Sequence, residues 1–296
     1  AEDFFFFLCS LIVCFKFSLD EVSRKRFNRT YATPSGLFKM RIHLYQNDIE
    51  WEDPERNISA VNEILGDCII SSGDLVILPE MFSTGFSMRP ELSNEIDKKS
   101  PTINFLERLA SKYSCCVIAG ITTKRNDQFF NEAFAVLPNK KMISYKKNHL
   151  FPLANEHKTY EAGYDLTVFE WSSWIIGMSI CYDLRFPELY RGLAEEKANL
   201  MINIANWPID RIEHWITLLR ARAIENQTYV AGVNRTGSDP NSTYNGRSMI
   251  IDPMGNIIND AGEHPGVHSS VIDLDQVNSW RSNFPALEDM MSKKYN

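Results

Sequence analysis

The chain has 296 residues, of which 44% are hydrophobic and 23% are charged, and its formal net charge is -7. This length and composition are typical of a globular protein with a large core. The acidic balance argues against a surface for nucleic acid or for an anionic membrane, because both need clustered Lys and Arg. We therefore expect small-molecule partners.

No linker rich in Pro, Gly or Ser divides the chain, so we expect one domain over residues 40–296. Residues 1–39 are interpreted as an N-terminal extension outside this domain. Its apolar stretch from Phe4 to Phe15 is too short to span a bilayer, and it follows Glu2 and Asp3, where a secretory leader carries positive charge. The six cysteines form no C-x-x-C pair, which favours reduced thiols in a cytoplasmic protein.

Hydrophobic periodicity predicts alternating strands and helices in the first half of the domain. In chain order these are a strand from Met40 to Gln46, a helix that starts at Asp53 and Pro54 with an apolar face reaching Ile69, a strand from Leu75 to Leu78, a helix from Ser100 and Pro101 to Tyr113, and strands from Cys116 to Thr122, Phe129 to Leu137 and Met142 to Lys146.

The second half continues the same alternation. We predict strands from Trp174 to Ile180, Asn199 to Ile204, Tyr229 to Val233, Ser248 to Ile251 and Val267 to Asp273, with helices over Phe186 to Glu196 and Ile212 to Asn226. Many apolar strands with helices between them indicate a layered α/β protein.

Three reactive side chains each follow a predicted strand, namely Glu80, Lys147 and Cys181. Loops at strand ends can present side chains while the sheet holds them still. Cys181 also precedes a helix predicted to begin near Phe186 and Pro187, whose N–H groups favour the nucleophilic thiolate. Taken singly, each residue has an ordinary alternative: a buried strand cysteine, a helix-capping or ion-paired glutamate, and a solvated lysine.

The segments around these residues resemble, in the same order, the three catalytic motifs of the nitrilase, or carbon–nitrogen hydrolase, superfamily. They are Leu78 to Phe82, Tyr145 to Phe151 and Ser179 to Glu188, and the resemblance runs from about Met40 almost to the C-terminus, through Asn206-Trp207-Pro208 and Arg220 to Asn226. It implies a four-layer α-β-β-α sandwich in which Glu80, Lys147 and Cys181 meet in one pocket.

The resemblance also implies roles for these residues. Cys181 is the expected nucleophile and Glu80 the general base, while Lys147 and the backbone N–H of Tyr182 are expected to bind the oxyanion. Glu156 resembles a second glutamate that many members place beside the triad, with a surface loop acid as the alternative. The resemblance implies a homo-oligomer, either a dimer or larger. It implies no metal and no organic cofactor.

The run from Met81 to Met88 and the segment around Trp207 look most like the omega-amidase branch, which hydrolyses the terminal amide of 2-oxo acid amides such as 2-oxoglutaramate or 2-oxosuccinamate. Met81, Phe86 and Trp207 are predicted to contact substrate. An N-carbamoyl amine amidohydrolase, an aliphatic amidase, a nitrilase and a non-catalytic binding member stay open as alternatives, because pocket residues rather than the triad select the substrate.

Two unrelated chemistries are weaker alternatives. A papain-like enzyme would pair Cys181 with a histidine, although that family's local signature is absent. The candidate histidines are His149, His157 and His214. A metal hydrolase is suggested only by the spacing of His264 and His268, and the Pro and Gly between them disfavour a helix that would bear ligands.

Overall fold

The strand β2 (Leu75–Ile77) shows why this chain forms layers. Leu75 and Ile77 belong to one buried apolar cluster, whereas Val76 and Leu78 belong to another. Successive side chains of a strand point to opposite faces of its sheet. Because all four are apolar, both faces of the sheet must be covered by other elements.

The computed structural model describes residues 38–95 and 100–290 of the chain. Its helices are α2 (Pro54–Gly66), α3 (Pro101–Tyr113), α4 (Pro187–Glu195), α5 (Ile212–Asn226) and α6 (Leu274–Asn283). Its strands are β1 (Lys39–Gln46), β2, β3 (Asn94–Glu95), β4 (Cys116–Arg125), β5 (Gln128–Val136), β6 (Met142–Lys146), β7 (Val168–Trp171), β8 (Trp174–Ile180), β9 (Leu200–Ala205), β10 (Tyr229–Asn234), β11 (Thr236–Ser238), β12 (Thr243–Asn245), β13 (Met249–Ile251), β14 (Ile257–Asp260) and β15 (Gly266–Asp273).

Within the described residues the strands form two large sheets and a small hairpin. One sheet has the order β15-β1-β2-β4-β5-β6, with β3 beside β4, and the other has the order β14-β13-β10-β9-β8-β7. The strands β1, β2 and β4 are mutually parallel, as are β8, β9 and β10. Parallel neighbours bring their carboxyl ends to the same edge, so residues that follow these strands collect there.

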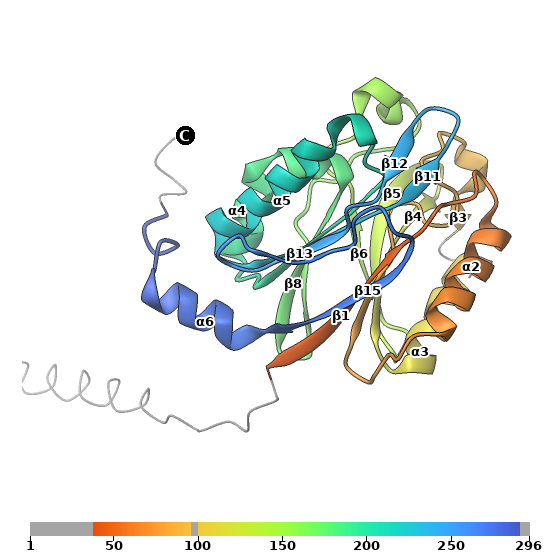
Figure 1. Ribbon diagram of the computed structural model, residues 1–296. Helices are drawn as coiled ribbons and strands as arrows, with labels where there is room; N and C mark the ends of the chain where they lie inside the picture. The colour runs from red at the N-terminus through yellow and green to blue at the C-terminus, as the bar shows by residue number, and fades with distance from the viewer. Residues whose placement is uncertain (1–37, 96–99, 291–296) are drawn as a thin grey trace, which may run out of the picture. The chain divides into compact units, whose positions relative to one another are not determined.

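The two sheets pack face to face, with α2 and α3 on one outer side and α4 and α5 on the other (Figure 1). Ile118 of the first sheet and Ile202 of the second share the central apolar cluster, to which α5 contributes Trp215. A smaller cluster lies under α2 and α3 and includes Leu65 and Leu106. The predicted four-layer α-β-β-α sandwich is confirmed.

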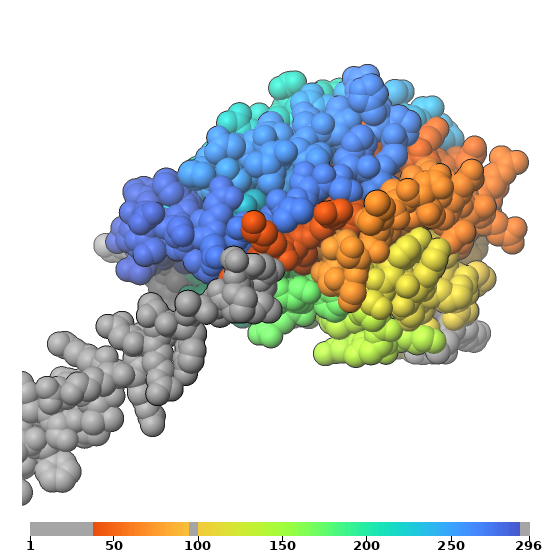
Figure 2. Space-filling view, turned by 60° about the horizontal axis from the view of Figure 1, so that its bottom comes forward, coloured from red at the N-terminus to blue at the C-terminus, as the bar shows by residue number. Residues whose placement is uncertain are grey.

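The first and last long strands are neighbours. Lys39 to Gln46 of β1 pair antiparallel with Asp273 to Gly266 of β15, and Figure 2 shows the two strands side by side. The pairing joins segments more than two hundred residues apart, which no local sequence pattern indicates. Through this pairing, β15 forms an edge of the first sheet.

The structure also corrects the sequence reading in places. The predicted apolar helix face reaches Ile69, but α2 ends at Gly66 and Ile69 is 81% exposed. Glycine is a poor helix former, and the helix stops there although the apolar spacing continues. The strands β7 and β14, the β11–β12 hairpin and α6 were not predicted, because they are short or largely polar segments with weak periodicity.

The N-terminal extension predicted over residues 1–39 lies outside the described residues up to residue 37, and β1 begins at Lys39. Cys9 and Cys14 fall in that part as well. Among the residues described, no helix is both long enough and apolar enough to cross a bilayer.

Candidate active site

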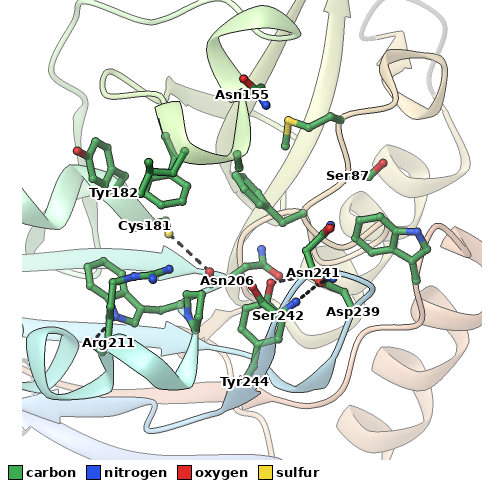
Figure 3. A pocket seen from close by; sticks show the side chains of 18 of the residues that line it. Ser87, Asn155, Cys181, Tyr182, Asn206, Arg211, Asp239, Asn241, Ser242 and Tyr244 are labelled. Atoms are coloured by element: carbon green, nitrogen blue, oxygen red, sulfur yellow. Dashed lines mark hydrogen bonds between the residues drawn. The ribbon is translucent and has the colours of Figure 1, made fainter.

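Cys181 lies where β8 ends and a short 3-10 helix, Cys181–Arg185, begins. Its φ of 46° is a left-handed conformation that is strained for a residue other than glycine. Asp183 holds the turn, because its Oδ2 accepts hydrogen bonds from Ile180 N at 3.0 Å and from the Tyr145 hydroxyl at 2.7 Å. The turn leaves Cys181 partly accessible at the wall of a pocket (Figure 3).

Glu80 follows β2 of the other sheet and is fully buried. Gly120 of β4 permits this position, since a Cβ atom there would lie 2.6 Å from Glu80 Cα. The carboxylate reaches across to the end of β9, where Asn206 N donates to Glu80 Oε2 at 2.9 Å. The backbone at Glu80 packs closely against Gly120 of β4, and the Glu80 carboxylate is directed toward the second sheet.

Lys147 follows β6 and is also fully buried, so the alternative of a solvated surface charge is wrong. Its Nζ lies 2.8 Å from Glu80 Oε1, 3.0 Å from Glu156 Oε2 and 3.1 Å from Glu156 Oε1. An ammonium group has three N–H donors, and these two carboxylates are its partners here. Lys147 thus joins Glu80 and Glu156 in one buried charged cluster.

Glu156 opens a short 3-10 helix, Glu156–Lys158, and is fully buried rather than a surface loop acid. Its Oε2 also accepts a hydrogen bond from Phe151 N at 2.6 Å. A buried carboxylate is tolerated only when charge and hydrogen bonds replace its water. Lys147 and the Phe151 amide supply both.

Two asparagines complete the cluster, and sequence reasoning assigned neither of them a role. Asn131 Nδ2 donates to Glu80 Oε1 at 2.7 Å and to Glu156 Oε1 at 2.9 Å, so one amide group bridges both carboxylates. Asn206 Nδ2 donates to the Glu80 carbonyl at 2.7 Å. A signal for Asn131 was present, since it is a polar residue inside the apolar strand β5. Buried polar groups at such positions need specific partners.

The thiol of Cys181 is held in its neutral form by its surroundings. Burial raises the pKa of Cys181 well above its usual value, and the negative charge of Glu80 raises it further, while Lys147 lowers it. The sulfur lies 3.9 Å from Asn206 O, which a thiol proton can approach. A neutral thiol in this site requires a base before it can act as a nucleophile.

The charges of the cluster are mutually dependent. Burial alone lowers the pKa of Lys147, but Glu156, Glu80 and Cys181 together raise it above its usual value. Burial raises the pKa of Glu156, an effect that Lys147 opposes. Lys147 is therefore a fixed positive charge, and the cluster carries two carboxylates for one ammonium.

A pocket of about 540 Å³ opens above this cluster. Cys181 and Tyr182 line it, as do Phe86 and Trp207, two of the three residues predicted to contact substrate. The Lys147 ammonium lies 5.2 Å from the centre of the Phe86 ring. The pocket thus brings Cys181 and the predicted oxyanion-binding residue Tyr182 together with an aromatic wall.

Met81, the third residue predicted to contact substrate, does not line this pocket and is fully buried. Its φ of 46° places it in a tight turn, where its carbonyl accepts hydrogen bonds from the amides of Thr84 and Gly85. Met81 therefore shapes the turn after Glu80, and that prediction is corrected. Phe86, which follows this turn, lines the pocket.

The histidines do not form a Cys-His pair with Cys181. His149 Nδ1 lies 2.8 Å from Asp183 Oδ1, and its ring stacks on Phe186 with centroids 3.7 Å apart. His157 and His214 are exposed. The papain-like alternative therefore has no geometric support.

The metal-hydrolase alternative has no more support. His268 Nε2 contacts the His264 backbone carbonyl at 2.9 Å, as a structural hydrogen bond does. In residues 38–95 and 100–290, no three side chains of His, Cys, Asp or Glu are grouped as a metal site would need.

Comparisons with known proteins identify the family of this chain. The sequence model of the carbon-nitrogen hydrolase family matches residues 41–282. An omega-amidase of Yersinia enterocolitica is 35% identical over 254 residues, covering 84% of this chain and 96% of the relative. A 2-oxoglutaramate amidase of Bacillus subtilis is 33% identical over 261 residues, covering 87% of this chain and all of the relative.

A solved structure gives the same result. A CN-hydrolase superfamily protein of Xanthomonas campestris, which holds an arsenic adduct in its active site, superposes with a TM-score of 0.82 at 35% identity. The match covers 86% of this chain and 98% of that protein. The family model and the relatives span nearly the whole described fold, and this chain belongs to the carbon-nitrogen hydrolase family.

Proposed function

We propose that this chain is an omega-amidase, which hydrolyses the terminal amide of a 2-oxo acid amide such as 2-oxoglutaramate to the 2-oxo acid and ammonia. The carrying observation is the position of Cys181 at the pocket wall beside the buried cluster of Glu80, Lys147 and Glu156. Relatives named omega-amidase or 2-oxoglutaramate amidase, at 33% and 35% identity, support the choice of substrate.

In the first half-reaction Glu80 accepts the proton of the Cys181 thiol as sulfur attacks the amide carbonyl. The new S–C bond converts the carbonyl into a tetrahedral oxyanion. The C–N bond then breaks, and Glu80 returns its proton to the leaving nitrogen, which departs as ammonia. The acyl group stays on Cys181 as a thioester.

The oxyanion is stabilised by Lys147 and by the backbone N–H of Tyr182. Both oxygens of Glu156 lie at nearly equal distances from Lys147 Nζ, so one N–H can serve both, a second serves Glu80, and the third is left for the oxyanion. The Tyr182 amide lies in the first turn of the 3-10 helix that begins at Cys181. Donors fixed before the reaction are worth more than donors that must reorganise.

In the second half-reaction Glu80 takes a proton from water, and the hydroxide attacks the thioester carbonyl. The S–C bond breaks, the carboxylic acid leaves, and the proton returns to Cys181. Glu156 keeps Lys147 in place throughout, because the two groups remain paired beside the reacting atoms. Asn131 likewise keeps the carboxylates of Glu80 and Glu156 in place through its two hydrogen bonds.

The experiment is an assay of 2-oxoglutaramate hydrolysis that measures ammonia and 2-oxoglutarate together. Wild-type protein should release them in equal amounts, and acid quenching during turnover should trap an acylated peptide that contains Cys181. Cys181→Ala should abolish both signals and keep the fold. Cys68→Ala is the matched control, because Cys68 is another partly accessible thiol but lies on the loop after α2.

Turnover by Cys181→Ala would exclude the mechanism. Parallel rates on glutamine, an aliphatic amide, an N-carbamoyl amine and a nitrile decide among the other members of the family. Absence of turnover on every one of them would favour a binding protein that has kept the fold. The cytoplasmic location and the homo-oligomer stay predictions.

A further inference from the structure

The proposed substrate brings a charge that the pocket must accommodate. 2-Oxoglutaramate keeps one carboxylate at the end opposite its amide. The cluster below Cys181 already carries the carboxylates of Glu80 and Glu156 against the single ammonium of Lys147. Like charges repel strongly where water is scarce, so an anionic substrate requires a positive group elsewhere in the pocket. This argument rests on the proposed function.

Three arginines line the pocket, and they differ in how far their charge is already compensated. Arg89 donates to Glu52 Oε2 at 2.6 Å and to Glu91 Oε1 at 2.7 Å, so two carboxylates satisfy it. Arg185 lies 3.3 Å from His214 Nδ1 and over the Trp207 ring. Arg89 is therefore unsuited to a further anion.

Arg185 has a ring nitrogen of His214 as its polar partner, whereas Arg211 is held by an aromatic ring. Within residues 38–95 and 100–290 its guanidinium pairs with no carboxylate, and its contact is with the Phe151 ring, whose centre lies 5.8 Å away. A guanidinium group presents a planar fork of donors that matches a carboxylate. Its donors are thus available to a bound carboxylate.

The neighbours of Arg211 connect it to the reacting atoms. Its carbonyl accepts a hydrogen bond from Trp207 Nε1 at 2.7 Å, and it ends the short 3-10 helix Ile209–Arg211. The guanidinium of Arg211 lies over the ring of Phe151, and the backbone amide of Phe151 donates a hydrogen bond to Glu156. In Figure 3, Arg211 lies on the same side of the pocket as Cys181, and the short 3-10 helix that it ends lies beside β12.

We infer that Arg211 binds the carboxylate of the 2-oxo acid amide, and that Arg185 adds a second positive charge to this subsite. Trp207 then acts as a positioning residue: its ring lies under Arg185 and its indole N–H holds the backbone of Arg211. The substrate extends from Arg211 at one end to Cys181 at the other, which places the terminal amide at the nucleophile.

The test compares two substrates that differ only in the charged group. Levulinamide carries a methyl group where 2-oxoglutaramate carries its carboxylate, and it keeps the ketone and the amide. Loss of a hydrogen bond to a charged group weakens binding strongly, so Arg211→Gln should raise the KM for 2-oxoglutaramate by roughly 10- to 100-fold. The kcat for 2-oxoglutaramate and the kinetics with levulinamide should change little.

Arg89→Gln is the matched control. It removes an arginine from the same pocket, but the charge of Arg89 is already compensated by Glu52 and Glu91. Its KM for 2-oxoglutaramate should stay within about 3-fold of the wild-type value. Arg211→Lys keeps the charge but loses the fork, and should fall between wild type and Arg211→Gln. Binding of 2-oxoglutarate to the Cys181→Ala variant, by calorimetry with and without Arg211→Gln, tests the same contact without turnover.

The outcomes separate this inference from the proposed function. Equal losses with both substrates in Arg211→Gln, together with unchanged binding of 2-oxoglutarate, would overturn the role of Arg211 and leave the amidase proposal standing. A wild-type protein that hydrolyses levulinamide and not 2-oxoglutaramate would overturn both. If Arg211→Gln does not fold, a wild-type KM in Arg211→Lys would refute bidentate binding.

Discussion

Replacement of Lys147 by Met would leave two buried carboxylates without the ammonium that both contact. Glu80 and Glu156 lie 2.8 Å and 3.0 Å from Nζ, and all three side chains are inaccessible to solvent. Removing one partner of a buried ion pair costs about 3–5 kcal/mol, because the other partner keeps its charge without water. In a chain of this size that corresponds to a fall in melting temperature of roughly 6–20 °C.

The effect should depend on pH in a defined direction. Lys147 opposes the rise in the pKa of Glu156 that burial causes, so its removal raises this pKa further in the folded state. A carboxyl group whose folded pKa lies above its unfolded pKa stabilises the fold at low pH and loses this contribution as pH rises. The destabilisation should therefore be smallest near pH 4.5, the ordinary value for Glu, and should grow toward neutral pH.

Thermal unfolding followed by tryptophan fluorescence at pH 5 and pH 8 measures both effects. Lys146→Met is the control, since the neighbouring ammonium lies over the Phe130 ring and should contribute about 0.5–1 kcal/mol. The double variant Lys147→Met with Glu156→Gln removes one charge of each sign and should recover part of the loss. Similar melting of Lys147→Met and Lys146→Met at pH 8 would refute the buried cluster.

Two further predictions concern Cys181 and Asn131. Glu80→Gln should abolish turnover but move the pH profile of Cys181 alkylation by iodoacetamide to lower pH, because the Glu80 charge raises the pKa of the thiol; a shift to higher pH would contradict this. Asn131→Leu removes the donor that bridges both carboxylates and lowers the pKa of Glu156. The kcat should therefore fall by roughly 10- to 100-fold, and the acidic limb of the pH–rate profile should move to higher pH. An unchanged acidic limb in Asn131→Leu would reduce Asn131 to a packing residue.

The sequence predicted the strands and helices of the core because their apolar residues repeat with the period of each element. In the predicted strand from Leu75 to Leu78, four consecutive apolar residues indicated burial on both faces, and the structure places them in two separate clusters. The elements that were missed have few such residues. The helix α6, for example, buries only Leu274 and Val277.

The candidate site was predictable to the extent that its residues follow strands or match a family motif. Glu80, Lys147 and Cys181 satisfied both conditions, and Glu156 the second. Asn131 was missed because it satisfied neither, and a polar residue within a strand does not identify its partners. Met81 was assigned to the substrate because it lies in a motif, whereas its backbone conformation turns it away from the pocket.

The sequence by itself determined which residue types could perform the chemistry and which elements would carry them, since both depend on side chains and local periodicity. Only the tertiary structure decided their distances, burial and charge compensation. Glu80 and Glu156 share one ammonium, Arg89 is neutralised and Arg211 is not, because contacts between residues distant in the chain depend on how the two sheets pack. Such contacts leave no pattern in any local stretch of sequence.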